Sequence, residues 1–272
     1  MPQVRKPTTQ RPDHWVWITG ASSGIGAELA KQWSQRGARL VLTARREAEL
    51  HALLQQCENP ESHILVTADL TNVDQRNSAI NQVMEATGGI DTLVNNAGIS
   101  QRSLAIDTDE AVYRRLMEIN YFAPVALSSA VLPSMIKRGA GRIVTISSIA
   151  GQVGTPLRSG YCGAKHAIAG YMDSLRAEVA KQGVQVTVVY PGFIATEISR
   201  KAMVGDGSPQ GHDDPGIVNG IAATDCAAKI IAATESHKPE VVIAGRRERT
   251  ALAIKRISPR LLRRLVATAD VT

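Results

Sequence analysis

Tyr161 and Lys165 are the side chains in this sequence best suited to acid–base chemistry. They stand four residues apart in a stretch with a helical pattern, YCGAKHAIAGYMDSLRAEVAK, so they share one helical face. A free tyrosine has a pKa of about 10 and exchanges protons poorly near neutrality. A nearby ammonium favours the phenolate and would lower that pKa toward the working range. Because a Tyr-x-x-x-Lys pair is common by chance, it needs support from other residues.

Ser148 is the next candidate, because it follows a predicted strand over residues 142–147. Its hydroxyl could hold a substrate oxygen and stabilise charge that develops there. A cap or turn serine is the alternative interpretation. Ser147 is expected to point to the opposite face of the strand. Cys162 and His166 flank the Tyr–Lys pair but point elsewhere on the helix, and we expect them to be packing or surface residues.

A glycine-rich turn, TGASSGIG at residues 19–26, joins the first predicted strand to the first predicted helix. Glycines at such a junction permit a tight turn, a close approach of the backbone to a pyrophosphate, and close packing of helix on strand. The spacing is G-x3-G-x-G and differs from the ordinary dinucleotide fingerprint. Its position predicts a phosphate-binding turn, and a purely structural turn is the alternative.

The end of the second predicted strand indicates which dinucleotide would bind. An NAD site commonly presents a carboxylate there, about 20 residues beyond the glycines. This chain has Arg45 and Arg46 instead. A carboxylate would repel a 2′-phosphate, whereas a guanidinium can pair with it bidentately. The sequence therefore predicts NADP(H), with Arg45 as the main contact and Arg46 as a second candidate. The alternative is two solvated arginines that begin a helix.

Seven short apolar runs alternate with longer helical patterns. They cover residues 15–19, 39–44, 63–68, 91–96, 142–147, 184–190 and 240–244. Near-continuous apolarity is expected when helices cover both faces of a parallel sheet. Ile25, Leu29 and Trp33 share one face of the first helix, and Thr108 and Thr224 are predicted N-caps of later helices. This alternation predicts a single α/β domain with a doubly wound parallel sheet.

The composition of the 272 residues, 44% apolar and 21% charged, argues against a disordered chain. No apolar run reaches the roughly 18–20 residues that cross a bilayer, which argues against a spanning helix. The first residues lack the apolar region of a secretory signal. Cys57, Cys162 and Cys226 are widely spaced and indicate neither a disulfide framework nor a zinc site. We therefore expect a reducing, cytoplasmic compartment and no bound metal.

Residues 199–217 interrupt the alternating pattern. They include MVGDGSPQGHDDPG, and their Gly, Pro and Asp content predicts a mobile excursion between a strand and a helix. Because the segment follows the carboxyl end of a strand, where open α/β sheets bind ligands, we expect a lid over the site. A surface insertion is the alternative. His212, Asp213 and Asp214 could bind metal by composition, but in a mobile loop we expect them to be solvated.

The net charge of +6 resides in a basic C-terminal extension, residues 246–272, with eight arginines and lysines and two acids. The preceding 245 residues balance 23 basic groups with 23 acidic groups. The extension could pack on a partner subunit or on its own domain, or lie as a basic amphipathic segment on an anionic membrane. Nucleic-acid binding is disfavoured, because no aromatic residues interleave the arginines. Residues 1–13 are expected to form a flexible tail before the domain at 14–245.

The chain resembles the short-chain dehydrogenase/reductase superfamily, in its form with a TGxxxGxG turn, over roughly residues 14–245. Five motifs occur in the family's order: TGASSGIG, Asp69-Leu70, Asn95-Asn96-Ala97-Gly98, the set of Asn120, Ser148, Tyr161 and Lys165, and Pro191-Gly192 with Thr196 following. The stretch NYFAPVALSSAVLPSMIKRGAGRIVTISS is further similar to the membrane-linked dehydrogenase/reductase members 7 and 7B. We expect no N-terminal hydrophobic anchor of the kind that eukaryotic members carry.

The resemblance implies a role for each catalytic position. Tyr161 would exchange a proton with the substrate oxygen, which Ser148 would orient. Lys165 would lower the tyrosine pKa and hydrogen-bond the nicotinamide ribose, and Asn120 would hold a water that links Lys165 to solvent. The expected cofactor-binding residues are Gly20, Ser22, Ser23, Gly24, Ile25, Gly26, Arg45, Arg46, Asp69, Leu70, Asn96, Ala97, Gly98, Tyr161, Lys165, Pro191, Gly192, Ile194 and Thr196.

These observations predict a Rossmann-like, NADP(H)-dependent oxidoreductase that interconverts a carbonyl and an alcohol of a small-molecule substrate by hydride transfer. Residues 149–160 and 199–217 are expected to shape the substrate pocket. The resemblance implies a homodimer or homotetramer. A protein that senses NADP(H) without turnover is the alternative, which the complete set of four catalytic positions disfavours. A membrane-surface scaffold that acts through the basic extension is a third hypothesis.

Overall fold

Seven strands run parallel in one sheet, within the residues 14–268 that the computed structural model describes. The predicted tail at residues 1–13 lies outside this range, as do residues 269–272. The strands are β1 (Trp15–Thr19), β2 (Arg39–Ala44), β3 (Ile64–Thr67), β4 (Thr92–Asn95), β5 (Gly141–Ile146), β6 (Val184–Pro191) and β9 (Glu240–Ile243). Their order in the sheet is β3-β2-β1-β4-β5-β6-β9, and all neighbours pair in parallel. The predicted doubly wound α/β fold is confirmed.

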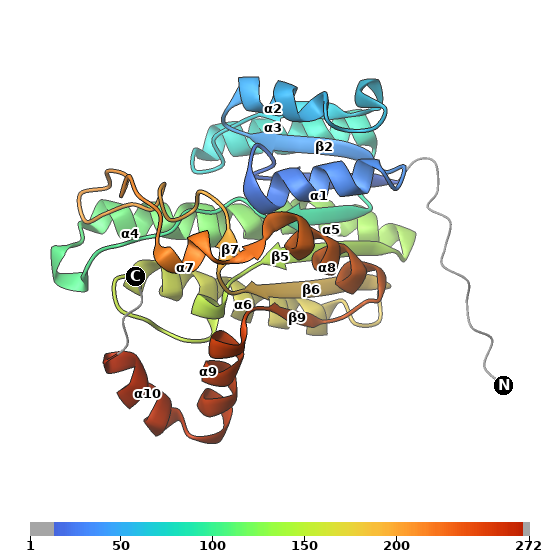
Figure 1. Ribbon diagram of the computed structural model, residues 1–272. Coiled ribbons are helices and arrows are strands. Elements are labelled where there is room, and N and C mark those ends of the chain that lie inside the picture. The colour runs from blue at the N-terminus through green and yellow to red at the C-terminus, as the bar shows by residue number, and fades with distance from the viewer. Residues whose placement is uncertain (1–13, 269–272) are drawn as a thin grey trace.

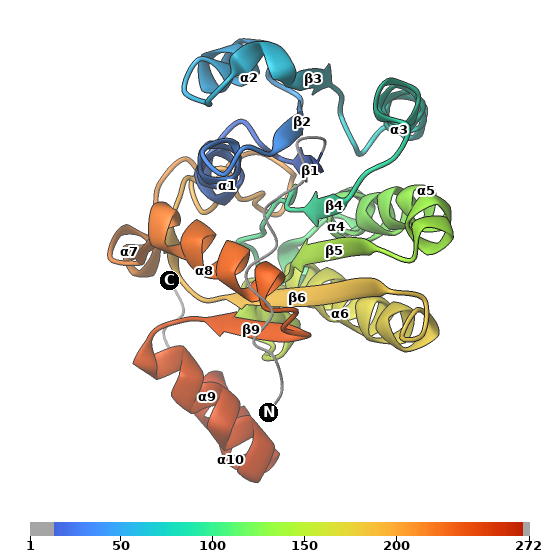
Figure 2. The same ribbon diagram turned by 90° about the vertical axis from the view of Figure 1, so that its right-hand side faces the viewer.

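Helices cover both faces of this sheet (Figures 1 and 2). One face carries α1 (Gly24–Ser34), α2 (Glu47–Leu54) and α8 (Ala223–Glu235), and the other carries α3 (Val73–Thr87), α5 (Ala123–Arg138) and α6 (Ser159–Glu178). Side chains of β1 alternate between the two cores, with Ile18 on the α1 side and Trp17 on the α5 side. Leu29 and Trp33 are buried under α1, as their helical spacing predicts. Each such burial contributes roughly 1.5–3 kcal/mol.

The strand order reverses between β1 and β4. The chain proceeds outward from β1 through β2 to β3 and then crosses back, so β4 pairs with the other edge of β1. The connections that leave β1 and β4 therefore diverge at the carboxyl edge of the sheet. Open α/β sheets bind ligands in the crevice at such a switch point. This crevice is where the glycine turn and the Asn96 segment meet.

Small elements at the carboxyl edge differ from the sequence prediction. A second, two-stranded sheet pairs β7 (Ile194–Ala195) with β8 (Ile221–Ala222), and both strands are too short to give a periodic signal. The two predicted threonine caps were wrong. Asp109 precedes α4 (Glu110–Met117), while the Thr108 hydroxyl donates to the Leu104 carbonyl at 2.6 Å. Thr224 lies inside α8, and its hydroxyl donates to Glu28 Oε2 at 3.0 Å.

A continuous helical stretch runs through Glu110–Arg138, with one π-helical turn at Glu118–Phe122 between α4 and α5. By length and composition alone this stretch could cross a membrane, although it contains no long uninterrupted apolar run. In the fold, Leu127, Val131 and Met135 are buried against the sheet. We therefore interpret it as a core helix whose apolar face packs on β4 and β5.

The basic extension forms a helical hairpin, α9 (Arg246–Ile257) and α10 (Pro259–Ala267), that projects from the body beyond β9 (Figures 1 and 2). Several hydrogen bonds join α9 to the domain, among them those of Arg249 to the Val242 and Ala244 carbonyls, at 3.0 Å each. The amide of Phe193 donates to Glu248 Oε1 at 3.3 Å, and Lys255 donates to the Gln152 carbonyl. Part of the extension therefore packs on its own domain, one of the alternatives that the sequence left open.

Candidate active site

The turn between β1 and α1 needs a glycine at three positions. Gly20 and Gly24 have φ of +63° and +56°, a backbone region that L side chains rarely adopt. A Cβ on Gly20 would lie 2.8 Å from Ala97 Cα. A Cβ on Gly26 would lie 2.4 Å from the Gly20 carbonyl oxygen, so Gly26 allows the helix to pack under the turn. The turn is therefore shaped by backbone-to-backbone contact.

Asn96 joins the end of β4 to this turn. Its Nδ2 donates to the carbonyls of Thr19 and Gly20 at 2.9 and 3.2 Å, and its amide donates to Thr19 Oγ1 at 3.0 Å. Asn95, by contrast, is buried within the sheet layer, where its Nδ2 donates to Ser128 Oγ at 3.0 Å. Asn96 thus joins the two sides of the crevice and also faces the space beside the turn.

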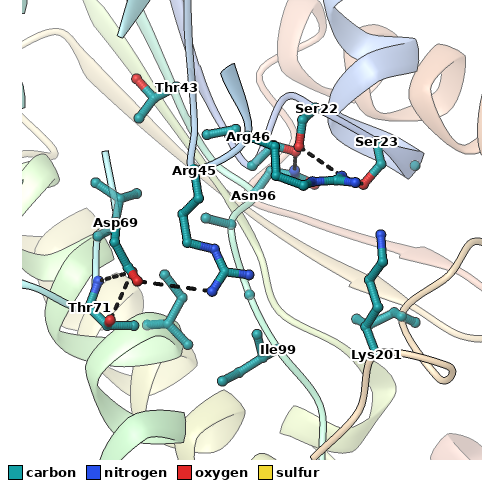
Figure 3. A pocket seen from close by; sticks show the side chains of 18 of the residues that line it. Ser22, Ser23, Thr43, Arg45, Arg46, Asp69, Thr71, Asn96, Ile99 and Lys201 are labelled. Atoms are coloured by element: carbon teal, nitrogen blue, oxygen red, sulfur yellow. Dashed lines mark hydrogen bonds and ion pairs between the residues drawn. The ribbon is translucent and has the colours of Figure 1, made fainter. Parts of the chain in front are cut away.

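A hollow of about 300 Å³, termed the turn hollow, lies beside the turn (Figure 3). Most of the predicted cofactor-binding residues line it. They are Gly20, Ser22, Ser23, Gly24, Ile25, Arg45, Arg46, Asp69, Leu70, Asn96, Ala97, Gly98 and Thr196. Gly26 lies below the turn and outside this lining. A space walled by bare backbone, hydroxyls and arginines suits the phosphates and adenosine of a dinucleotide.

Cationic side chains reach the turn hollow from two directions (Figure 3). Arg46 donates to the hydroxyls of Ser22 and Ser23 at 3.1 and 3.3 Å, whereas Arg45 extends toward Asp69, with 4.0 Å between Nη1 and Oδ2. Lys201 points into the same hollow from the 199–217 segment. Sequence reasoning missed Lys201, because no local motif indicates that this segment folds back over the turn.

A second space of about 560 Å³, termed the tyrosine cavity, adjoins the turn hollow. The four predicted catalytic residues, Asn120, Ser148, Tyr161 and Lys165, all line it, as do Pro191, Gly192 and Ile194. Ile25, Asn96, Gly98, Thr196 and Ile198 line both spaces. The two spaces therefore share a wall, and together they include every predicted site residue except Gly26.

Lys165 and Asn120 face each other across Gly98. Lys165 Nζ donates to the Ile146 carbonyl at 2.8 Å, and a Cβ on Gly98 would come within 2.7 Å of Asn120 Oδ1 and 3.5 Å of Lys165 Nζ. Asn120 lies in the π-helical turn, and its Nδ2 donates to the Ile99 carbonyl at 3.0 Å. Its buried Oδ1 accepts no hydrogen bond from any residue of 14–268. That oxygen is thus available to a group between Asn120 and Lys165.

Burial dominates the titration of the central pair. It lowers the pKa of Lys165 from 10.5 to about 8. The pKa of Tyr161 is raised, because burial outweighs the hydrogen bond with Ser148 and the nearby Arg102 and Arg158 guanidiniums. The Lys165 ammonium donates to the Ile146 carbonyl and lies 5.8 Å from the tyrosine ring centroid. The expectation that Lys165 lowers the pKa of this phenol stays a prediction.

The 199–217 segment is anchored on the domain. Met203 exchanges backbone hydrogen bonds with Ser100 and Arg102 at 2.9 and 2.8 Å, and Ile217 in α7 (Pro215–Val218) lines the tyrosine cavity. The solvation expected for Asp214 was wrong, because this carboxylate is buried and paired with Arg102. Among the described residues, no group of three His, Cys, Asp or Glu side chains is placed to hold a metal ion.

The C-terminal hairpin also contributes to the tyrosine cavity. Arg247, Glu248, Ala251 and Val266 line it, although the sequence suggested an extension outside the catalytic domain. Phe193, which follows the Pro-Gly motif, lines the same part of the wall. The local sequence pattern does not indicate that the hairpin lines this cavity, because its position depends on where β9 ends and α9 begins.

The profile of the family described as short chain dehydrogenase matches residues 14–205. The chain belongs to the short-chain dehydrogenase family. It is 40% identical over 271 residues to dehydrogenase/reductase SDR family member 7B of Danio rerio, covering 97% of this chain and 87% of that protein. It is 46% identical over 210 residues to dehydrogenase/reductase SDR family member 7 of Homo sapiens, covering 75% of this chain and 62% of that protein. The resemblance to members 7 and 7B is confirmed.

Solved structures of short-chain dehydrogenases share the fold. One from Streptomyces avermitilis superposes with a TM-score of 0.79 at 28% identity, covering 93% of this chain and 96% of the other. One from Sphingobium yanoikuyae, in complex with NADPH, gives a TM-score of 0.76 at 27% identity, covering 95% and 97%. As a short-chain dehydrogenase, the protein is an oxidoreductase of a family that binds a nicotinamide cofactor.

Proposed function

We propose that this short-chain dehydrogenase is an NADP(H)-dependent oxidoreductase that interconverts a carbonyl and an alcohol on a small molecule. The observation that carries this proposal is the convergence of Ser148, Tyr161 and Lys165 on one cavity, which shares a wall with the turn hollow. Acid–base and cofactor-binding positions thus lie on either side of Asn96 and Gly98. This is the arrangement that proton exchange beside a bound dinucleotide requires.

NADP(H) is favoured over NAD(H) by the charges of the turn hollow. Arg45, Arg46 and Lys201 line this hollow, and Ser22 and Ser23 add hydroxyl donors. A 2′-phosphate would pair with guanidinium and ammonium groups there. The Sphingobium yanoikuyae relative is described in complex with NADPH, which agrees with this assignment. When bound, the cofactor supplies or accepts the hydride.

The chain's own residues would bind, orient and exchange the proton. Tyr161 would donate its phenolic proton to the substrate oxygen during reduction and accept it back during oxidation. The Ser148 hydroxyl, which is hydrogen-bonded to that phenol, would orient the same oxygen. Lys165, whose pKa near 8 keeps both protonation states accessible, would pass the proton toward Asn120. The free Oδ1 of Asn120 supports a water at that point.

A panel of carbonyl compounds tests the activity, with NADPH consumption as the readout and NADH as the control. We expect turnover of at least one compound with NADPH and much slower turnover with NADH. The rival function, a cofactor sensor, predicts saturable NADPH binding with no turnover of any compound. A preference for NADH would contradict the cofactor assignment.

We further propose that the hairpin contacts an anionic membrane surface. Ile257, Leu261 and Leu265 are exposed on it, beside seven arginines and one lysine. Apolar residues flanked by cations suit anionic lipid headgroups. Co-sedimentation with phosphatidylserine vesicles should be lost when Leu261 and Leu265 become aspartate. Equal binding by the variant would contradict this proposal, and a change from dimer to monomer in light scattering would assign the surface to a second copy.

A further inference from the structure

A buried charge cluster lies in the wall of the tyrosine cavity. Arg102 Nε and Nη2 donate to Asp214 Oδ2 at 2.9 and 2.5 Å, and Arg158 Nη2 donates to the same oxygen at 3.2 Å. The three residues are 9%, 2% and 8% exposed. Gln210 Nε2 donates to the other carboxylate oxygen at 3.0 Å. The two guanidiniums thus share one carboxylate oxygen within a buried cluster.

The cluster joins two segments that are far apart in the sequence. Asp214 comes from the end of the 199–217 segment, and Arg102 comes from the connection between β4 and α4. The neighbouring Gln101 Oε1 accepts hydrogen bonds from the amides of Gly160 and Tyr161 at 2.8 and 3.4 Å. Residues 100–103 therefore connect the 199–217 segment to the first turn of α6, which carries the phenol.

The two guanidiniums of the cluster act on Tyr161. Arg102, Arg158 and Tyr161 all line the tyrosine cavity, and both guanidiniums lower the pKa of the phenol against the effect of burial. The other charged groups that line the cavity are Lys165 on α6, and Arg247 and Glu248 on α9. Glu248 is directed at the Phe193 amide and Lys165 at the Ile146 carbonyl. Buried charges interact at low effective dielectric and are little screened by salt.

We propose that Arg102, Asp214 and Arg158 form a positioning cluster that stabilises the ionised form of Tyr161 and makes this stabilisation depend on the docked 199–217 segment. The proposal rests on the proposed function, in which Tyr161 exchanges the proton. It assigns Arg158 and Asp214 opposite electrostatic effects on one phenol. A purely structural cluster would have no such opposition, because losing either residue would only loosen the fold.

The test is a titration of the Tyr161 phenolate by near-ultraviolet absorbance. Each variant of the full chain is compared with its own Tyr161→Phe partner, with and without NADP+, so that the phenol is observed even if no substrate turns over. The variants are Arg158→Met, Arg158→Lys and Asp214→Asn. Arg200→Met is the matched control, because Arg200 pairs with Asp213 at 2.5 Å on the exposed surface of the same segment.

Arg158→Met should raise the apparent pKa of Tyr161 by on the order of one unit, and Asp214→Asn should lower this pKa. Arg158→Lys and Arg200→Met should both leave the pKa near the wild-type value. Arg158→Met leaves a balanced Arg102–Asp214 pair and is expected to fold even where Asp214→Asn does not. No shift in folded Arg158→Met, or shifts of the same sign in Arg158→Met and Asp214→Asn, would overturn the proposal. Failure of Arg158→Met to fold while Arg158→Lys folds would also overturn it. A normal shift without any turnover would refute the proposed function alone.

Discussion

At the scale of single residues, the site combines side chains whose charges are shaped by burial. Lys165 and Tyr161 are both buried, and in each case burial disfavours the charged form. The lysine thus becomes a weaker base and the phenol a weaker acid than either would be in water. The chemistry assigned to Tyr161 then depends on the partners that oppose burial, namely Ser148, Arg102 and Arg158.

Replacing Tyr161 with phenylalanine should abolish proton transfer and leave the cavity filled. We expect turnover of any accepted carbonyl compound to fall by about 10²–10⁴-fold, because general acid catalysis contributes that much. NADPH binding, measured by fluorescence titration, should change by less than about threefold, since the hydroxyl is the only group removed. Unchanged turnover would show that another group supplies the proton.

The two arginines after β2 should differ in their effect on cofactor choice. Arg46 already bonds the turn serines, so Arg46→Met should remove a charge-assisted contact to a 2′-phosphate and raise the KM for NADPH about 10- to 100-fold. Arg45→Met tests the sequence-based expectation that Arg45 is the main contact. The KM for NADH serves as the control and should change little in both variants. Equal rises for NADPH and NADH would contradict a role in recognising the 2′-phosphate.

At the scale of elements, the sequence predicted the regular alternation of strands and helices. The seven strand positions and the buried face of α1 follow from runs such as RLVLTA and from the spacing of Leu29 and Trp33. The threonine caps failed, because Thr108 and Thr224 form other hydrogen bonds once tertiary contacts are available. The strands β7 and β8 have two residues each and exist only because the chain folds back beside α7.

Gly26 tests how tightly α1 must pack under the turn. A methyl group there would lie 2.4 Å from the Gly20 carbonyl oxygen, so Gly26→Ala should destabilise the fold by about 1–3 kcal/mol and weaken NADPH binding. Gly170→Ala in α6 is the matched control. A Cβ at that exposed position meets nothing within 4 Å, so we expect stabilisation by roughly 1 kcal/mol. Urea unfolding of both variants compares the two, and a neutral Gly26→Ala would contradict the close contact.

At the scale of the whole molecule, residues that are distant in the sequence complete the site. The meeting of the four proposed catalytic positions in one cavity could be expected, because each belongs to a motif with fixed spacing. The positions of Lys201, Arg247 and Val266 could not be expected, since only the path of the folded chain brings them to the cavities. Asp214 was placed in solvent by its local composition, yet its partners Arg102 and Arg158 lie 112 and 56 residues away.

The free energy of unfolding should depend on pH, because burial lowers the pKa of Lys165. Its pKa falls from 10.5 when unfolded to about 8 when folded, so between these values the unfolded state binds more protons. The stability contributed by this residue therefore rises as pH increases through that interval. Lys165→Met should be more stable than wild type near pH 7, by on the order of 1–3 kcal/mol, and the difference should shrink toward pH 10.5. Urea unfolding at both pH values measures this difference, and a constant gap would contradict it.

Residues 198–217 form part of the walls of both the turn hollow and the tyrosine cavity. Lys201 reaches the turn hollow, Ile198 lines both spaces, and Ile217 lines the tyrosine cavity. Attraction between Lys201 and a nucleotide phosphate would add to the contacts that already hold this segment on the domain. We propose that a nucleotide in the turn hollow would thereby fix one wall of the tyrosine cavity, so that the nucleotide would bind before the small-molecule substrate.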